Sequence, residues 1–119
     1  MAVTLRGLGD CGIAHNDLKA DNVVLRREED RLVATTIDLG NASCIGDAPY
    51  HSMEEGRFPH VAPELRRGLK AESNSDAYSL GFMMDEVSIL VPLADGDLIG
   101  LANAAAEDDP KDRISVVDM

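Results

Sequence analysis

The order of apolar and polar positions predicts a β-hairpin in the first third of the chain. Residues 23–25 form a short apolar run that suits a strand. Residues 26–31 are mostly charged and predict the turn of the hairpin. Residues 32–37 are mainly apolar and β-branched and predict the returning strand. The segments before residue 23 and after residue 37 therefore flank the predicted hairpin, one at either end.

The second half of the chain shows a helical period instead. It predicts one helix over 74–90, a second over 97–107 and the start of a third at Ile114. The second helix should end before Pro110. The first helix should be capped by one of three polar residues, Ser73, Asn74 or Ser75. The apolar positions that share one face of this helix are Leu80, Met83, Met84 and Val87. Those that share one face of the second helix are Leu98, Leu101, Ala102 and Ala105.

The remaining segments predict little regular structure. Residues 1–10 suit the last turns of a helix at best, because Gly7, Gly9 and Gly12 favour a turn. Residues 41–61 have no clear period, and a loop of this length in a small domain is usually functional or mobile. The expected fold class is therefore α+β, mainly α-helical with a small β-hairpin.

Composition limits the size of the core and the kinds of partner. With 119 residues, 3% aromatics and no Trp, the chain suits one small domain whose core rests on aliphatic side chains. The net charge of −11 would repel nucleic acids and anionic membranes, so neither is expected as a partner. No apolar run reaches the roughly 18 residues of a membrane span. Without a signal-peptide pattern, and with Cys11 and Cys44 expected as free thiols, a cytoplasmic or nuclear location is predicted.

Four short segments carry the candidate chemistry. Residues 15–22 read His-Asn-Asp-Leu-Lys-Ala-Asp-Asn, and residues 37–40 read Ile-Asp-Leu-Gly. Residues 62–64 read Ala-Pro-Glu, and residues 108–113 read Asp-Asp-Pro-Lys-Asp-Arg. In order and spacing they resemble the H-R-D-L-x-x-x-N, D-F-G, A-P-E and D-P-x-x-R segments of eukaryotic protein kinases. The resemblance covers the chain from His15 to Arg113 and implies a kinase C-terminal lobe.

The resemblance implies a role for each residue of the site. Asp17 would be the catalytic base that accepts the proton of the attacking hydroxyl. Lys19 would face the γ-phosphate of ATP, which makes it both a catalytic and a cofactor-binding residue. Asn22 and Asp38 would bind Mg²⁺ through hard oxygen ligands and so help to bind the nucleotide. The expected cofactors are ATP and Mg²⁺, and the expected partner is a protein substrate, with Ser or Thr favoured because of Lys19.

Other matching residues have structural roles in the resemblance. His15 would pack beneath the metal-binding Asp38 and take no part in acid–base chemistry. Asp76 would accept hydrogen bonds from the backbone of residues 15–22. Glu64 and Arg113 would form an ion pair that is at least partly buried and that joins the segment before residue 64 to the helices.

The chain also departs from the kinase pattern. Asn16 replaces the Arg that clamps a phosphorylated loop, so activity should not need loop phosphorylation; Ser43, Tyr50 and Ser52 remain possible acceptors. Leu39 replaces a Phe, and the stretch between residues 87 and 98 is too short for the helix that commonly docks protein substrates.

The N-terminal lobe has no counterpart in these residues. No G-x-G-x-x-G and no V-A-I-K lysine occurs, so residues 1–119 are expected to be a partial kinase domain, truncated at both ends and inactive in isolation. Two alternatives remain: a non-catalytic, pseudokinase-like interaction module, and a small-molecule phosphotransferase with a related lobe.

Overall fold

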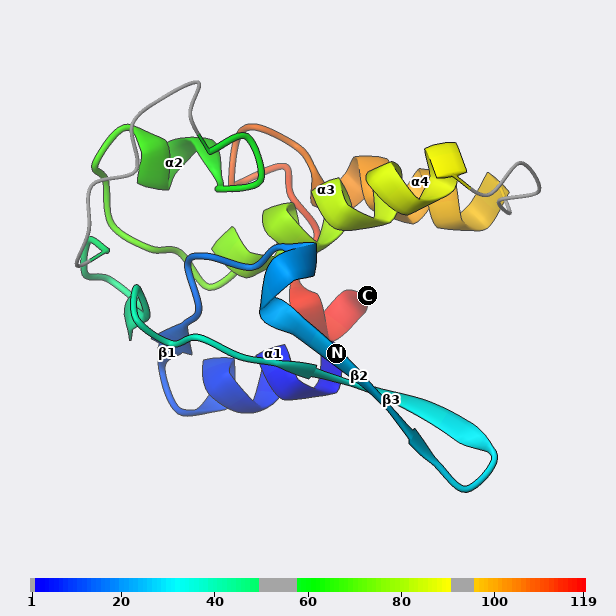
Figure 1. Ribbon diagram of the computed structural model, residues 1–119. Helices are drawn as coiled ribbons and strands as arrows, with labels where there is room; N and C mark the ends of the chain where they lie inside the picture. The colour runs from blue at the N-terminus through cyan, green and yellow to red at the C-terminus, as the bar shows by residue number, and fades with distance from the viewer. Residues whose placement is uncertain (1, 50–57, 91–95) are drawn as a thin grey trace.

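The computed structural model describes residues 2–49, 58–90 and 96–119. The predicted hairpin is present as β2 (Val23–Glu28) and β3 (Arg31–Thr36), which pair in antiparallel register from Val23 opposite Thr36 to Glu28 opposite Arg31. It projects away from the helices (Figure 1). The predicted turn over 26–31 is wrong, because both strands continue through the charged residues and the turn is only Glu29 and Asp30. Most of this hairpin is exposed, so its charged side chains can occupy strand positions without being buried.

A second pair of strands, which the sequence pattern did not predict, joins two distant segments. β1 (Ile13–Ala14) pairs with β4 (Ser43–Cys44), with Ile13 opposite Cys44. The backbone N–H of Ile45 extends the contact by donating to the carbonyl oxygen of Gly12 at 2.8 Å. These strands place the entrance to residues 15–22 beside the chain that leaves residues 37–40.

The N-terminal segment is more helical than predicted. Helix α1 (Ala2–Asp10) runs through both Gly7 and Gly9 and packs Leu5 into the core at 3% exposure. The chain turns at Gly12, whose φ of 72° lies in the left-handed region that favours glycine. The low helix propensity of Gly7 and Gly9 is outweighed here by the burial of the apolar face of α1.

The three helical predictions in the second half have different outcomes. Helix α3 (Ser75–Leu90) agrees with the prediction over 74–90, and α4 (Gly96–Ala105) ends two residues before the predicted 107. The third helix is wrong, since only a single 3-10 turn, η2 (Val116–Asp118), follows Ile114. A short helix, α2 (Pro63–Arg66), begins with Pro63 in its first turn, where proline needs no N–H partner.

Two groups of buried side chains form the core, with α3 contributing to both (Figure 1). One lies toward α2, and the other lies toward α1 and η2. Their members are mainly aliphatic, as the composition predicted: Ala14, Val61, Ala62, Leu65, Ala71 and Tyr78 in the first; Leu5, Leu18, Ala77, Leu80 and Val116 in the second. Among the described residues, no helix is long and apolar enough to cross a membrane.

The close contact between α3 and α4 at Gly81 gives a direct test of this packing. A Cβ added at Gly81 would lie 2.6 Å from the Cβ of Ala105 and 2.8 Å from the carbonyl oxygen of Ala102. We expect Gly81→Ala to lower the free energy of unfolding by about 1–3 kcal/mol, since the helices must move apart. Denaturant unfolding measures this change.

The matched control for that variant is Gly100→Ala in α4. No atom lies within 4 Å of a Cβ at Gly100, so the gain in helix propensity, up to about 1 kcal/mol, should dominate there. A Gly81→Ala variant as stable as the wild-type chain would show that α3 and α4 are not packed as described.

Candidate active site

The loop at residues 15–19 is attached to α3 through one buried carboxylate. The backbone N–H of His15 donates to Oδ2 of Asp76 at 2.7 Å, and the N–H of Asn16 donates to Oδ1 at 3.0 Å. Burial raises the pKa of the Asp76 carboxyl, and these two hydrogen bonds lower it; the net pKa lies above the usual value. The two bonds support the left-handed backbone at Asn16, where φ is 69°. The contact predicted for Asp76 is therefore confirmed.

Side chains along this loop alternate between the core and the surface. Leu18 is fully buried, whereas Asp17 and Lys19 on either side of it are partly exposed. Lys19 has an extended backbone, with φ of −150° and ψ of 166°, and precedes the 3-10 turn η1 (Ala20–Asn22). Asp17 and Lys19 are therefore both partly open to solvent, one on either side of the buried Leu18.

His15 connects the loop to the segment that contains Asp38. Its ring is fully buried, and Nε2 lies 3.1 Å from the carbonyl oxygen of Ile37. A carbonyl oxygen can only accept, so Nε2 carries the hydrogen and donates it. Nδ1 accepts the backbone N–H of Asp17 at 3.3 Å. Both ring nitrogens are therefore used in structural contacts, as the kinase resemblance implies.

The side chain of Asn22 holds Asp17 in place through both its main chain and its carboxylate. Its side-chain nitrogen Nδ2 donates to the carbonyl oxygen of Asp17 at 2.8 Å and to Oδ2 of Asp17 at 3.3 Å. Its backbone carbonyl accepts the N–H of Ile37 at 2.8 Å, which ties residue 22 to the residue before Asp38. The structure therefore brings Asp17, Asn22 and the segment of Asp38 together.

The oxygen atoms of Asn22 and Asp38 suit a magnesium ion. Nδ2 of Asn22 is used in contacts with Asp17, so Oδ1 is the atom of this side chain that could bind a metal, and Asp38 is an exposed carboxylate whose Oδ1 accepts the N–H of Gly40 at 3.1 Å. No group of three or more His, Cys, Asp or Glu residues that could hold a metal occurs in residues 2–49, 58–90 and 96–119. Mg²⁺ normally keeps several waters and binds one or two protein carboxylates together with phosphate oxygens, so two hard ligands are adequate.

The structure shows the surroundings of Asn16 and Leu39, the two residues that replace an Arg and a Phe of the kinase pattern. Asn16 is buried, and its Nδ2 donates to the carbonyl oxygen of Asn41 at 3.0 Å and to Oγ of Ser43 at 2.8 Å. An amide that is bound to the segment 41–43 and carries no charge offers no cation to a phosphate. Leu39 is 56% exposed, so it does not pack as the replaced Phe would. Tyr50 and Ser52 lie outside the described residues.

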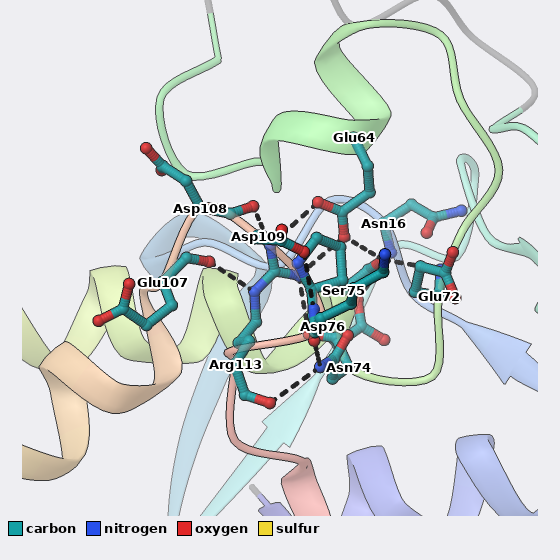
Figure 2. Close-up of polar contacts among 12 residues, drawn as sticks. Asn16, Glu64, Glu72, Asn74, Ser75, Asp76, Glu107, Asp108, Asp109 and Arg113 are labelled. Atoms are coloured by element: carbon teal, nitrogen blue, oxygen red, sulfur yellow. Dashed lines mark hydrogen bonds and ion pairs between the residues drawn. The ribbon is translucent and has the colours of Figure 1, made fainter.

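Glu64 and Arg113 form a bidentate ion pair inside the molecule, and this prediction is confirmed (Figure 2). Nη1 of Arg113 lies 2.7 Å from Oε1 of Glu64, and Nη2 lies 3.0 Å from Oε2. The Arg113 side chain is 0% exposed and that of Glu64 is 7% exposed. The ring of Tyr78 covers the guanidinium, with 5.1 Å between the ring centroid and Cζ.

All five guanidinium N–H groups of Arg113 are used. Two of them donate to Glu64, and the other three donate to the backbone carbonyl oxygens of Glu107, Asn74 and Asp108, at 2.8, 3.2 and 3.0 Å. Such complete satisfaction is what a buried charge requires. These contacts bind α2, the start of α3 and the segment after α4 to one another.

The carboxylate of Glu64 is stabilised in its charged form. Burial alone raises its pKa, but the hydrogen bonds from Arg113 and from the hydroxyl of Ser75 at 2.7 Å outweigh burial, so the pKa lies below the usual value. A lowered pKa means that the contribution of Glu64 to folding is complete above its unfolded pKa and is lost as the pH falls through the folded value.

Sequence reasoning missed one residue of the site, His60. Its Nε2 lies 2.8 Å from Oδ1 of Asp17, although the two residues are 43 positions apart. His60 belongs to the stretch at 41–61, which was recognised only as a loop, and no spacing rule links it to residue 17.

Comparison with known proteins agrees with this geometry. The family described as "Protein kinase domain" matches residues 1–111. The chain belongs to the protein kinase family. It is 35% identical over 86 residues to the inhibitor of nuclear factor kappa-B kinase subunit beta of Bos taurus, covering 72% of this chain and 11% of that protein. This kinase segment therefore spans about a tenth of that relative.

Two further relatives differ in the kind of kinase that their names describe. The receptor protein-tyrosine kinase CEPR2 of Arabidopsis thaliana is 31% identical over 113 residues, which cover 89% of this chain and 11% of that protein. The serine/threonine-protein kinase RAD53 of Saccharomyces cerevisiae is 36% identical over 67 residues, which cover 56% of this chain and 8% of that protein. The family is shared, whereas the named substrate class is not.

The Glu64–Arg113 pair predicts a strong and specific coupling. Removing one partner leaves the other charge buried, so Glu64→Gln or Arg113→Met should each lower the free energy of unfolding by about 3–5 kcal/mol. The double variant should lose much less than the sum. A double-mutant cycle on urea unfolding measures the coupling energy.

The control for this cycle pairs Glu86→Gln, an exposed residue of α3, with Arg113→Met. These two changes should add, because distant sites without shared partners do not couple. A coupling energy near zero for residues 64 and 113 would mean that the ion pair does not contribute to the folded state.

Proposed function

We propose that the protein acts as a protein kinase, with Asp17 as the base that accepts the proton of a substrate hydroxyl. The observation that carries this proposal is the contact of Asn22 with Asp17, joined by backbone hydrogen bonding to the segment of Asp38. One small region thus contains a carboxylate base and two hard oxygen ligands. Of the Asp17 side chain, 20% is exposed, so a hydroxyl can reach it from outside.

The chain's own residues would perform three tasks in this reaction. Asp17 orients the hydroxyl and takes its proton as the oxygen attacks the γ-phosphorus of ATP, and ADP leaves with the electrons of the broken P–O bond. Lys19 offsets the negative charge that develops on the transferred group. Asn22 and Asp38 hold Mg²⁺, which supplies charge neutralisation at the phosphates when it is bound.

The preferred acceptor in this proposal is a Ser or Thr hydroxyl on a protein. Support comes from Lys19, which lies two residues after Asp17 in the pattern of Ser/Thr kinases. The compartment proposed is the cytoplasm or nucleus, supported by Cys11 and Cys44, which are both free and exposed.

A non-catalytic interaction module remains the second candidate, and the exposed hairpin favours it. Leu25 and Leu32 are each 67% exposed, and Val24 is 48% exposed. The register places Leu25 and Leu32 on the same face of the hairpin, and exposed apolar groups gathered on one face are typical of a surface that another segment or protein covers. Activity measurements on the natural protein that contains these residues separate the two candidates.

Replacement of the base is the test of the kinase proposal. Asp17→Asn keeps the size and shape of the side chain but cannot take up the hydroxyl proton, so kcat should fall by at least about 100-fold. Phosphate transfer from labelled ATP by the natural protein measures this.

The matched control is Asp21→Asn, an exposed carboxylate four residues along the same loop, which should leave kcat unchanged. An Asp17→Asn protein with full activity would exclude Asp17 as the base. A wild-type protein without any phosphate transfer would favour the interaction module.

We also propose that residues 1–119 are the C-terminal lobe of the kinase domain and bind Mg–ATP weakly by themselves. They carry Asn22 and Asp38 on one side of a nucleotide site but no glycine-rich loop or strand lysine. Positioning supplies most of the catalysis in phosphate transfer, and one wall of a site positions poorly. Calorimetric titration of this chain with Mg–ATP should give no binding in the micromolar range and no phosphate transfer.

Two variants control this titration. Asp38→Asn should remove whatever magnesium-dependent binding is seen, whereas Asp30→Asn, in the turn of the hairpin, should not change it. Micromolar affinity together with phosphate transfer by the 119-residue chain would overturn the proposal.

A further inference from the structure

We propose that His60 is a positioning residue for Asp17, which holds the carboxylate in the orientation needed by the base. This inference rests on the proposed function of Asp17. His60 lies in the segment before α2, and its Nε2 is 2.8 Å from Oδ1 of Asp17. The two side chains are 12% and 20% exposed, so the contact is largely shielded from water.

The chemistry of the two groups sets the direction of this hydrogen bond. An ionised carboxylate oxygen can only accept, so Nε2 of His60 must carry a hydrogen. Both the neutral Nε2–H tautomer and the imidazolium meet this condition. A separation of 2.8 Å is typical of a hydrogen bond that involves a charged partner, which is stronger than one between neutral groups.

His60 and Asn22 hold the two carboxylate oxygens separately. His60 donates to Oδ1, while Asn22 donates to Oδ2 at 3.3 Å and to the main-chain carbonyl of the same residue at 2.8 Å. The terminal torsion of an Asp side chain is broad, so one weak donor would leave it free to rotate. A second donor on the other oxygen restricts that rotation. Each oxygen keeps a further lone pair, so the base can still accept the hydroxyl proton.

The backbone on either side of His60 is itself well supported. Val61 and Ala62 are fully buried, and the N–H of Val61 donates to the carbonyl oxygen of Phe58 at 3.0 Å. The ring of Phe58 meets the ring of His60 edge to face, with centroids 6.2 Å apart. The imidazole is therefore presented by a fixed turn and can orient the base rather than follow it.

The test uses the 119-residue chain, with NMR signals that do not depend on activity. The side-chain amide of Asn22 reports on Asp17, because it donates to the same carboxylate. His60→Phe keeps a ring but removes the donor, and should shift the Asn22 Nδ2 signals and the Asp17 carboxyl carbon signal. His60→Gln, whose amide nitrogen can reach the position of Nε2, should restore both. Pro59→Ala is the control within the same segment and should change neither.

The reciprocal variant makes the test independent of the folding of His60→Phe. Asp17→Asn should move the ring ¹⁵N signals of His60, because it removes the charged acceptor. Unchanged Asn22 and Asp17 signals in a folded His60→Phe chain would overturn the inference. If that chain does not fold, unchanged His60 ring signals in Asp17→Asn would overturn it instead.

Kinetics of the natural protein extend the test to the reaction. We expect His60→Phe to lower kcat about tenfold with KM for ATP unchanged, and His60→Gln to recover most of the loss. A rise in kcat would show that His60 obstructs the base, which contradicts a positioning role. Failure of the proposed function differs from both results: the wild-type protein would transfer no phosphate while the NMR signals still responded to His60→Phe.

Discussion

The two hydrogen bonds from the backbone of His15 and Asn16 to the buried carboxylate of Asp76 are the constraint on which the site depends. Without them, two buried N–H groups would lack partners, at a cost of about 1–3 kcal/mol each. The left-handed backbone at Asn16 would also lose its support. Asp76 lies in the first turn of α3, which packs into both core groups, so its position is fixed. The two hydrogen bonds therefore also fix the backbone of the loop at residues 15–19.

The residues beside Asp76 attach the other parts of the molecule to the same helical turn. The side chain of Asn74 donates to the carbonyl oxygens of Pro110 and Arg113, at 2.7 and 3.1 Å. The hydroxyl of Ser75 donates to Glu64, which in turn binds Arg113 (Figure 2). Three consecutive residues thus hold the segment after α4, helix α2 and the loop at residues 15–19.

How much of this structure could be predicted depends on whether the contacts are local. The hairpin and α3 follow from periods within the chain. The turn was misplaced because a charged run usually indicates a turn, whereas on an exposed hairpin charged residues such as Arg26 are tolerated in a strand. Helix α1 was underestimated because Gly7 and Gly9 lower its intrinsic propensity, which packing of Leu5 then overrides. The pairing of β1 with β4 involves two residues on each side, and so short a pairing leaves no pattern in the sequence.

The residues of the candidate site also divide into those that local sequence patterns predict and one that they do not. Asp17, Lys19, Asn22 and Asp38 could be named because their order and spacing match a known pattern, and Glu64 and Arg113 because each belongs to its own short segment. His60 could not be named, since its contact with Asp17 depends on how residues 58–62 lie against residue 17, which is 43 positions away. Nothing in the local sequence specifies that path.

The most direct measurement of this account is the hydrogen exchange of two backbone amides. If Asp76 holds the loop, the amides of His15 and Asn16 should exchange slowly in the wild-type chain, as slowly as amides in the centre of α3. In Asp76→Asn, which replaces one accepting oxygen by a donor, at least one of the two should exchange much faster while the amides of α3 stay protected. Fast exchange of both amides in the wild-type chain, or unchanged protection in the variant, would contradict the claim that this carboxylate builds the site.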